Sequence, residues 1–267
     1  GMKPKLKAGM TEAEARSYGT LPPLDWLPPP SPEPASALRG MLGEVLAILS
    51  LPPFYFMVRR DDAEDLFESM RRVAPILLRL LGIELHIEGL APGPGVIVMW
   101  NQESHLEHLA LPAAISTPIR VLYNIEVSNV PLYGELLRRT GNYLVNRHDE
   151  AQWRASVSRA AKDIREHGVT LLISPEGTRS WDGNLLSLKR GGFILATEAQ
   201  APILPVTVVG GYERLPRTAM VVRPGPMGVS FGEPIETRGK TEGDIEALQA
   251  QVGKVFKETK ARYKNRV

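Results

Sequence analysis

Residues 169–180, Val-Thr-Leu-Leu-Ile-Ser-Pro-Glu-Gly-Thr-Arg-Ser, decide the fold class, because a short apolar run stops abruptly at a polar turn. The apolar residues 169–173 are typical of a buried strand, which Pro175 and Gly177 would end. In α/β folds, ligands bind beyond the carboxyl ends of the strands. There Gly177 permits a close approach to the backbone, and Arg179 offers donors that match a phosphate. On its own, the segment is equally compatible with an ordinary turn that carries an exposed arginine.

Similar short apolar runs alternate with segments of helical periodicity through most of the chain. The expected strands are residues 83–88, 95–100, 119–123, 142–146, 169–173, 203–209 and 227–231. The expected helices are residues 105–116, 132–140, 149–167, 188–199 and 242–261. Strands that alternate with helices are typical of a sheet covered on both faces. The sequence therefore predicts an α/β fold with a mixed, largely parallel sheet flanked by helices.

The sequence predicts three parts, because its first residues lack this alternation. Residues 1–36 are expected to form a proline-rich arm, since seven prolines between positions 22 and 34 exclude a helix or a central strand. Residues 37–82 are expected to form an amphipathic helical pair, and residues 83–267 the α/β domain itself.

The helical pair is expected at residues 38–58 and 62–81, and its first member is the most apolar stretch of the chain. That stretch approaches a membrane span, which takes about 20 apolar residues. However, Arg39 and Glu44 lie inside it and Pro52 interrupts it, which argues against a span. Two interpretations remain open. The pair either packs on the domain or seats the protein in the interface of a bilayer.

Composition excludes several classes of function. Among 267 residues, 43% are hydrophobic, which allows a sizeable core, and the net charge of +2 lacks the excess of a typical nucleic-acid binder. The absence of cysteine excludes disulfides, thiolate nucleophiles and cysteine metal sites. Lys3, Lys5 and Lys7 lead into polar sequence, so no secretory signal is expected. A reducing compartment is compatible, so we expect a cytoplasmic protein; if the helical pair seats it in a bilayer interface, it is peripheral on the cytoplasmic face of a membrane.

Four ordered motifs resemble those of the 1-acylglycerol-3-phosphate acyltransferase family. The first, Asn-His-x-Ser-x-x-Asp in the family, reads Asn-Gln-Glu-Ser-His-Leu-Glu at residues 101–107. The third, Pro-Glu-Gly-Thr-Arg-Ser, is unchanged at residues 175–180, and the fourth is Pro-Ile-Leu-Pro-Val at residues 202–206. The second consists of Glu126, Pro131, Gly134, Gly141 and Arg147. Four ordered motifs are far more specific than any one of them.

The resemblance implies an O-acyltransferase that acts on a phosphorylated glycerolipid. The acyl chain would move from acyl-CoA or acyl-carrier protein to a hydroxyl of a lysophosphatidate-like or glycerol-3-phosphate-like acceptor. In the family, a histidine oriented by the aspartate of the first motif removes the hydroxyl proton, and basic residues of the second and third motifs bind the acceptor phosphate. No cofactor beyond the donor substrate is implied, and no nucleic-acid partner.

The first motif departs from the family at both catalytic positions. Gln102 replaces the histidine, and a carboxamide does not accept a proton near neutral pH; Glu107 replaces the aspartate. Three interpretations remain open: a non-catalytic relative that binds lipid or acyl-CoA, an engineered knockout of an active enzyme, or a site that uses another base. Asn124 and Ile125 stand where many relatives carry lysines, which also allows a different acceptor.

The candidate residues follow from the matched motifs. The catalytic candidates are Gln102, Glu107 and the substitute base His105, and the substrate-binding candidates are Ser104, Arg147, Glu176, Gly177, Thr178 and Arg179. Ser104 is equally suited to capping a helix, and Arg147 to a salt bridge with Glu176. No metal site is expected, because His105, Glu107 and His108 lack the i, i+4 spacing that aims two histidines at one ion.

Overall fold

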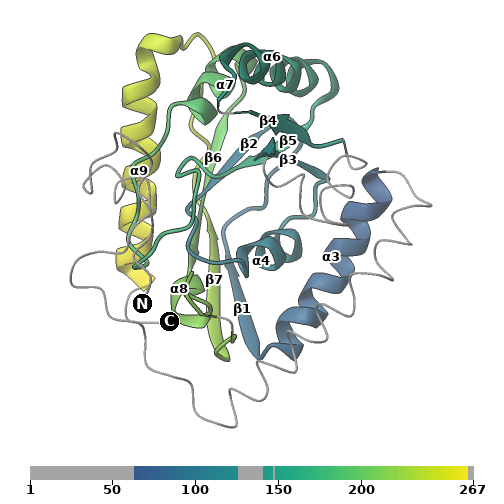
Figure 1. Cartoon of the computed structure of the whole chain (residues 1–267), viewed down its shortest axis with the longest axis vertical. Helices are drawn as coiled ribbons and strands as arrows, with labels where there is room; N and C mark the ends of the chain where they lie inside the picture. The colour runs from purple at the N-terminus through teal and green to yellow at the C-terminus, as the bar shows by residue number, and fades with distance from the viewer. Residues whose placement is uncertain (1–62, 126–140, 147, 220, 264–267) are drawn as a thin grey trace.

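Seven strands form one sheet in the order β1-β7-β6-β2-β5-β3-β4 (Figure 1). In the computed structural model, residues 63–125, 141–146, 148–219 and 221–263 are described. The strands are β1 Ile83–Glu88, β2 Ile97–Trp100, β3 Ile119–Asn124, β4 Tyr143–Val145, β5 Thr170–Ile173, β6 Ile203–Val209 and β7 Gly225–Phe231. Only β6 and β7 pair antiparallel among these strands, so the predicted mixed, largely parallel sheet is confirmed.

Helices lie on both faces of this sheet. They are α3 Ala63–Leu80, α4 Glu107–Ala114, α6 Glu150–His167, α7 Gly191–Ala199, the short α8 Gly211–Arg214 and α9 Ile245–Tyr263, which the 3-10 turn η2 Glu242–Asp244 precedes. The expected arm, the first helix of the pair and the helix at 132–140 lie outside the described residues, as does Arg147. None of the helices in the described part of the chain has the length and apolarity needed to cross a bilayer.

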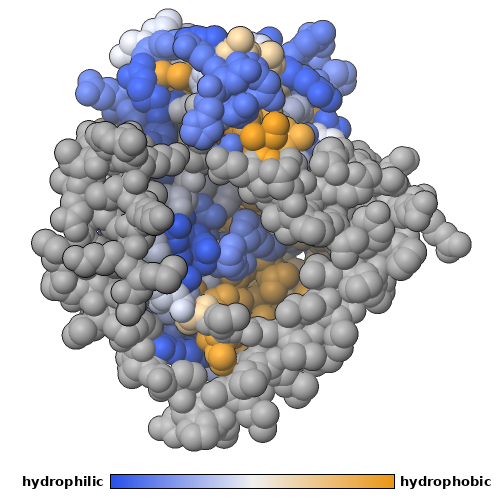
Figure 2. Space-filling model, in the orientation of Figure 1, coloured by the Kyte–Doolittle hydropathy of each residue, from blue (hydrophilic) through white to orange (hydrophobic). Residues whose placement is uncertain are grey.

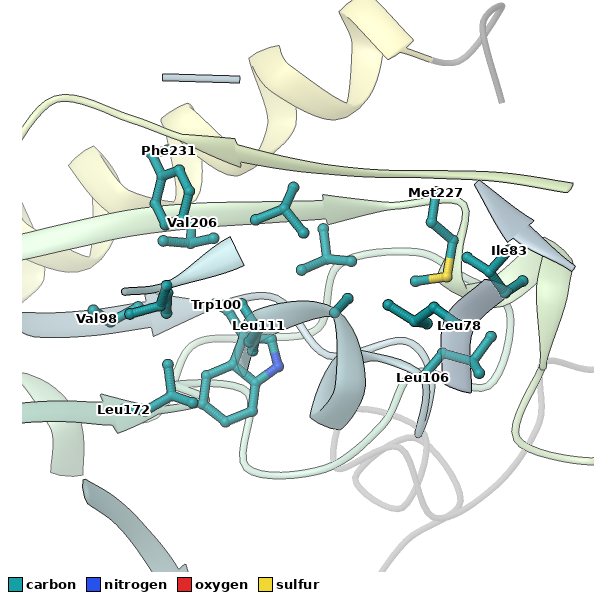
Figure 3. Close-up of a cluster of buried hydrophobic side chains, with 14 of the residues drawn as sticks. Leu78, Ile83, Val98, Trp100, Leu106, Leu111, Leu172, Val206, Met227 and Phe231 are labelled. Carbon is teal, nitrogen blue, oxygen red and sulfur yellow. The ribbon is translucent and has the colours of Figure 1, made fainter. Parts of the chain in front are cut away.

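The strand side chains alternate between two hydrophobic clusters, one on each face. Within β2, Val98 and Trp100 join the cluster beneath α3 and α4, whereas Ile97 and Met99 join the cluster beneath α6, α7 and α9. Figure 3 shows the first cluster, where side chains of the central strands meet those of α3 and α4. Central parallel strands are buried on both faces, which explains why their sequences read as continuous apolar runs.

Local sequence signals set the ends of α6. The Asp149 side chain accepts a hydrogen bond from the backbone N–H of Gln152 at 3.0 Å, which caps the first turn. Gly168 ends the helix in the left-handed region, with φ 63°. The helix expected at 149–167 therefore begins one residue later than expected and ends where expected.

The second helix of the expected pair is α3. Its inner face contributes Phe67 and Leu78 to the core, and it packs against α4. Its outer face leaves Ile76 and Leu80 exposed, at 56% and 45%. Because they stand four residues apart, these two side chains lie on one side of the helix.

Packing of α9 is a main source of stability, and Phe256 tests it. This side chain is fully buried in the second cluster. We expect Phe256→Ala to lower the free energy of unfolding by about 3–5 kcal/mol through lost burial and a residual cavity. The exposed Lys257→Ala on the same helix should change it by about 0.5 kcal/mol or less. Urea unfolding followed by circular dichroism measures both, and equal midpoints would contradict the assigned packing.

Candidate functional site

Three loops meet at one edge of the sheet because the strands that precede them are parallel neighbours. β2 lies between β6 and β5 and runs parallel to both. The carboxyl end of β2 leads into residues 101–106, that of β5 into residues 174–190, and that of β6 into residues 210–217. Ligands of α/β folds bind at such an edge. The first and third sequence motifs are therefore brought together, with the loop after β6 beside them.

Asn101 fixes the start of the first loop against β6. Its amide nitrogen donates to the carbonyl oxygen of Val208 at 2.9 Å, and its amide oxygen accepts the N–H of Val208 at 2.7 Å. This side chain thus imitates a strand partner just beyond the end of β2. Because Asn101 is buried, both bonds form away from water, where losing either would leave an unpaired polar group.

The carboxylate of Glu107 closes the first loop from inside. One oxygen accepts the backbone N–H groups of Glu103 and Ser104, at 2.6 and 2.8 Å, and the other accepts the indole N–H of Trp100 at 3.1 Å. Burial raises the pKa of Glu107 well above its ordinary value, against the opposing effect of these donors. Glu107 therefore shapes the backbone around the position that a catalytic base occupies in the family.

Ser104 and Gln102 also take part in the loop architecture. The Ser104 hydroxyl is buried and accepts the N–H of Leu106 at 3.2 Å, in the turn that leads into α4. The backbone of Gln102 is held on both sides: its N–H donates to Glu176 at 2.7 Å, and its carbonyl accepts the N–H of Ser180 at 2.9 Å. The Gln102 side chain is half-buried and, within the described part of the chain, its carboxamide has no hydrogen-bond partner.

Glu176 joins two loops and a turn. One carboxylate oxygen accepts the Gln102 N–H, and the other accepts the N–H of Leu186 at 2.6 Å. Burial raises the pKa of Glu176 to about 7. The neighbouring Gly177 adopts φ 69°, a conformation that favours glycine, and this turn presents Thr178 and Arg179. Both oxygens of Glu176 are thus occupied by backbone donors.

Two histidines lie close to each other near the arginines of the third motif and of the loop after β6. The rings of His105 and His108 are 5.8 Å apart. Although part of the His105 ring is exposed, desolvation by the surrounding chain lowers its pKa to about 4, and the nearby cations Arg179 and Arg217 act in the same direction. The imidazole of His105 is therefore neutral at pH 7, in the form that accepts a proton, although its basicity is weak.

Two arginines make the site cationic. Arg179 is half-buried, and burial lowers its pKa. Arg217, which the motif comparison did not select, donates to the Thr178 hydroxyl at 3.1 Å and to the Arg179 carbonyl at 3.0 Å. The sequence offered one signal for Arg217, which lies within 15 residues of the fourth motif, beyond the carboxyl end of the strand that carries it.

A lysine distant in sequence also holds the first loop, through the side chain of Glu103. Lys260 of α9 forms an ion pair with the buried carboxylate of Glu103 and donates to the carbonyl of Gly183 at 2.7 Å. The second Glu103 oxygen accepts the N–H of Tyr212 at 3.3 Å. Nothing in the local sequence marks these contacts, because Lys260 lies 157 residues from Glu103.

Comparisons with known proteins agree with this arrangement. Residues 82–209 match the protein-family model described as Acyltransferase. The 1-acyl-sn-glycerol-3-phosphate acyltransferase of Cocos nucifera is 27% identical, over 61% of this chain and 53% of that protein. The enzyme of the same name from Limnanthes alba is 34% identical, over 49% of this chain and 47% of that protein. The chain thus spans about half the length of these plant relatives. The mouse 1-acyl-sn-glycerol-3-phosphate acyltransferase alpha is 27% identical, over 78% of this chain and 73% of that protein.

A solved structure supports the fold. The crystal structure of the 1-acyl-sn-glycerophosphate (LPA) acyltransferase PlsC from Thermotoga maritima is similar, with a TM-score of 0.72. The similarity covers 87% of this chain and 98% of that chain, at 22% sequence identity. It shows that both chains share the same arrangement of strands and helices.

The raised pKa of Glu176 predicts a pH-dependent stability. Its folded-state pKa of about 7 exceeds the ordinary 4.5, so the stability from proton uptake is complete below about pH 4.5 and is lost as the pH rises through about 7. Glutamine does not titrate. The free energy of unfolding of wild type minus that of Glu176→Gln should therefore be about 1–3 kcal/mol larger at pH 5 than at pH 8.

Urea midpoints between pH 5 and pH 8 measure this difference. The exposed Glu233→Gln serves as the control, because it makes the same substitution at the surface. A constant difference for Glu176→Gln would show that Glu176 is ionised throughout this range in the folded protein.

Proposed function

Because the chain belongs to the 1-acylglycerol-3-phosphate acyltransferase family through its domain at residues 82–209, we propose that it moves an acyl group to a phosphorylated glycerolipid. The donor is an acyl thioester of CoA or of a carrier protein, and the acceptor is a lysophosphatidate-like or glycerol-3-phosphate-like alcohol. The observation that carries this proposal is the meeting of the first and third motifs, with two arginines, at one edge of the sheet.

The reaction joins the acceptor hydroxyl oxygen to the carbonyl carbon of the thioester and breaks the carbon–sulfur bond. The proton of the hydroxyl must leave, and the thiolate must finally receive one. Gln102 cannot take that proton. His105 carries a neutral imidazole and belongs to the same loop as Gln102, so we assign it as the base of residual turnover. The weak basicity of a ring with a pKa of about 4 predicts slow transfer.

The alternative function is binding without turnover. Gln102 favours this alternative. The hydrogen bonds that hold the loop are present, whereas the side chain that accepts the proton in the family is missing. A protein of this kind would hold lipid or acyl-CoA at the same edge of the sheet. A changed acceptor is a further alternative, which Asn124 and Ile125 favour.

Contact with a membrane surface would bring the lipid acceptor to the site. Figure 2 shows hydrophilic and hydrophobic surfaces side by side in the region of α4, as an acceptor with a charged head and an apolar tail requires. On α3, the exposed Ile76 and Leu80 stand near the exposed Arg79 and Arg72, of which Arg72 also forms an ion pair with Glu68. Apolar side chains framed by arginines suit an interface with anionic lipid. We therefore propose peripheral attachment through this face.

Flotation with liposomes tests the attachment. Replacing Ile76 and Leu80 together by Asp should lower the bound fraction about tenfold or more, because two apolar side chains no longer enter the interface. The matched control places the same charges at the same spacing on α6, through Ala151→Asp and Ala155→Asp, which are exposed. Equal loss in both double variants, or no binding of wild type to either neutral or anionic liposomes, would refute the proposal.

Release of CoA from acyl-CoA, with lysophosphatidate as acceptor, tests the transfer reaction. A thiol-reactive dye reports the product alone, because the chain has no cysteine. We expect Gln102→His to raise the rate about 10²–10⁴-fold, the usual contribution of a general base.

The same assay separates the two functions. His105→Ala should abolish the slow turnover of the wild type, whereas His86→Ala, a histidine of β1, should leave it unchanged. If no variant releases CoA but the protein binds acyl-CoA or lysophosphatidate, the transferase hypothesis is wrong and binding without turnover is supported.

A further inference from the structure

We infer that β1, the strand at one end of the sheet, pairs antiparallel with β1 of a second copy of this chain, so that the two sheets join into one. β7 separates β1 from β6, the nearest of the three strands that lead into the candidate site. The inference therefore concerns a different part of the molecule and goes beyond the proposed function.

The edge of β1 that points away from β7 is open. Among the described residues, β1 pairs with β7 alone. An edge strand presents backbone N–H and C=O groups that another strand can bind. Gly225 donates its N–H to the Gly82 carbonyl at 2.9 Å, and successive residues of a strand direct their backbone groups to opposite sides. Residues 84, 86 and 88 thus bond to β7, whereas residues 83, 85 and 87 direct their N–H and C=O groups to the open edge.

The residue opposite β1 and the exposure of its side chains agree with this assignment. Pro226, which has no N–H, stands opposite Glu84, at a position of β7 that makes no bond to β1. In the part of the chain that the structure describes, no backbone group bonds to residues 83, 85 and 87 across the open edge. The side chains of Glu84 and His86 are 75% and 60% exposed, and Ile87 is 51% exposed. The edge is therefore accessible from solvent.

The backbone limits the registers in which two copies of this edge can pair. Hydrogen-bonded residues of an antiparallel pair exchange both bonds, so residues that face the edge must meet each other. One such register sets Leu85 opposite Leu85 of the partner subunit. It places Glu84 opposite His86 of the partner subunit, and two-fold symmetry repeats this pair.

The neighbouring registers are less favourable. Moving the second strand by two residues in one direction sets Glu84 opposite Glu84 of the partner subunit. Moving it by two residues in the other direction sets Glu84 opposite Glu88 of the partner subunit. Like charges directly opposite each other destabilise a pair of strands, so the sequence of β1 favours the register centred on Leu85.

In this register both faces of the joined strands are complementary. Glu84 and His86 form the closer, non-hydrogen-bonded type of pair, and an imidazole donates an N–H to a carboxylate in either protonation state. The two side chains already approach to 3.4 Å within one copy, so the pairing extends an existing contact across the symmetry axis. On the opposite face, Ile87 lies beside Ile83 of the partner subunit, which removes apolar surface from water. Charge and burial thus both favour a second copy as the occupant of this edge.

Sedimentation velocity of the full chain, over a range of concentrations, tests the pairing. We expect wild type to show a monomer–dimer equilibrium. His86→Glu should raise the dissociation constant of the dimer about tenfold or more, because it sets two pairs of carboxylates face to face. Adding Glu84→Lys to His86→Glu restores opposite charges and should return the constant to within about threefold of wild type. Gln251→Glu is the matched control, since it adds a carboxylate at an exposed position of α9 and should leave the constant unchanged.

A second measurement reads the register directly, because the chain has no cysteine. Glu84→Cys and His86→Cys, mixed in equal amounts and oxidised, should form a disulfide-linked dimer on a non-reducing gel. The Cα atoms of a non-hydrogen-bonded pair lie about 4.5 Å apart, which is within reach of a disulfide. Neither variant alone should form the linked dimer, and Gln251→Cys should not link to either of them.

A wild type that stays monomeric at every concentration would overturn the inference, and so would a dimer whose dissociation constant is the same in His86→Glu. A disulfide formed by Glu84→Cys alone or by His86→Cys alone would overturn the register centred on Leu85. Neither measurement involves the release of CoA, so the result is independent of the proposed function.

Discussion

The bond between the Glu176 carboxylate and the backbone N–H of Gln102 is the contact on which the site depends. It ties the loop after β2 to the loop after β5, and the second carboxylate oxygen ties both to Leu186. Neighbouring parallel strands bring their carboxyl ends together, but they do not set the loop conformations beyond them. A buried carboxyl group with two backbone donors does so, because each bond is directional and any loss leaves a buried group unpaired.

Buried carboxyl groups also accept backbone N–H groups around the first loop. The charged groups of the site therefore fall into two sets. Glu107 and Glu103 point inward, toward backbone donors and toward Lys260, while Arg179 and Arg217 gather on the side of the third motif. Burial raises the pKa of Glu107 and of Glu176, so these carboxyls are poor counterions for the arginines. The acidic residues thus build the scaffold and leave a positive field in which an anion is favoured.

Local patterns allowed most of the fold to be predicted, and tertiary contacts explain the rest. All seven strands were expected, because each is a short apolar run bounded by turn residues. β2 begins at Ile97 and not at residue 95, since Gly95 adopts φ 75°. α4 begins at Glu107 and not at residue 105, because the Glu107 carboxylate holds the preceding residues in a loop. The four-residue helix α8 carried no periodic signal.

The site shows the same division between what sequence reveals and what it does not. The resemblance selected residues that lie together, but the partners of Glu107 and Glu176 are backbone groups, which no side-chain pattern encodes. Arg217 contacts residues 38 and 39 positions away, and Lys260 contacts a residue 157 positions away.

Gln102 takes part in these contacts through its backbone. Its N–H and carbonyl hold the site together, whereas its side chain contributes no bond within the described residues. A change at position 102 can therefore alter the proton chemistry and leave the architecture intact, so an intact architecture is compatible with transfer and with binding alike.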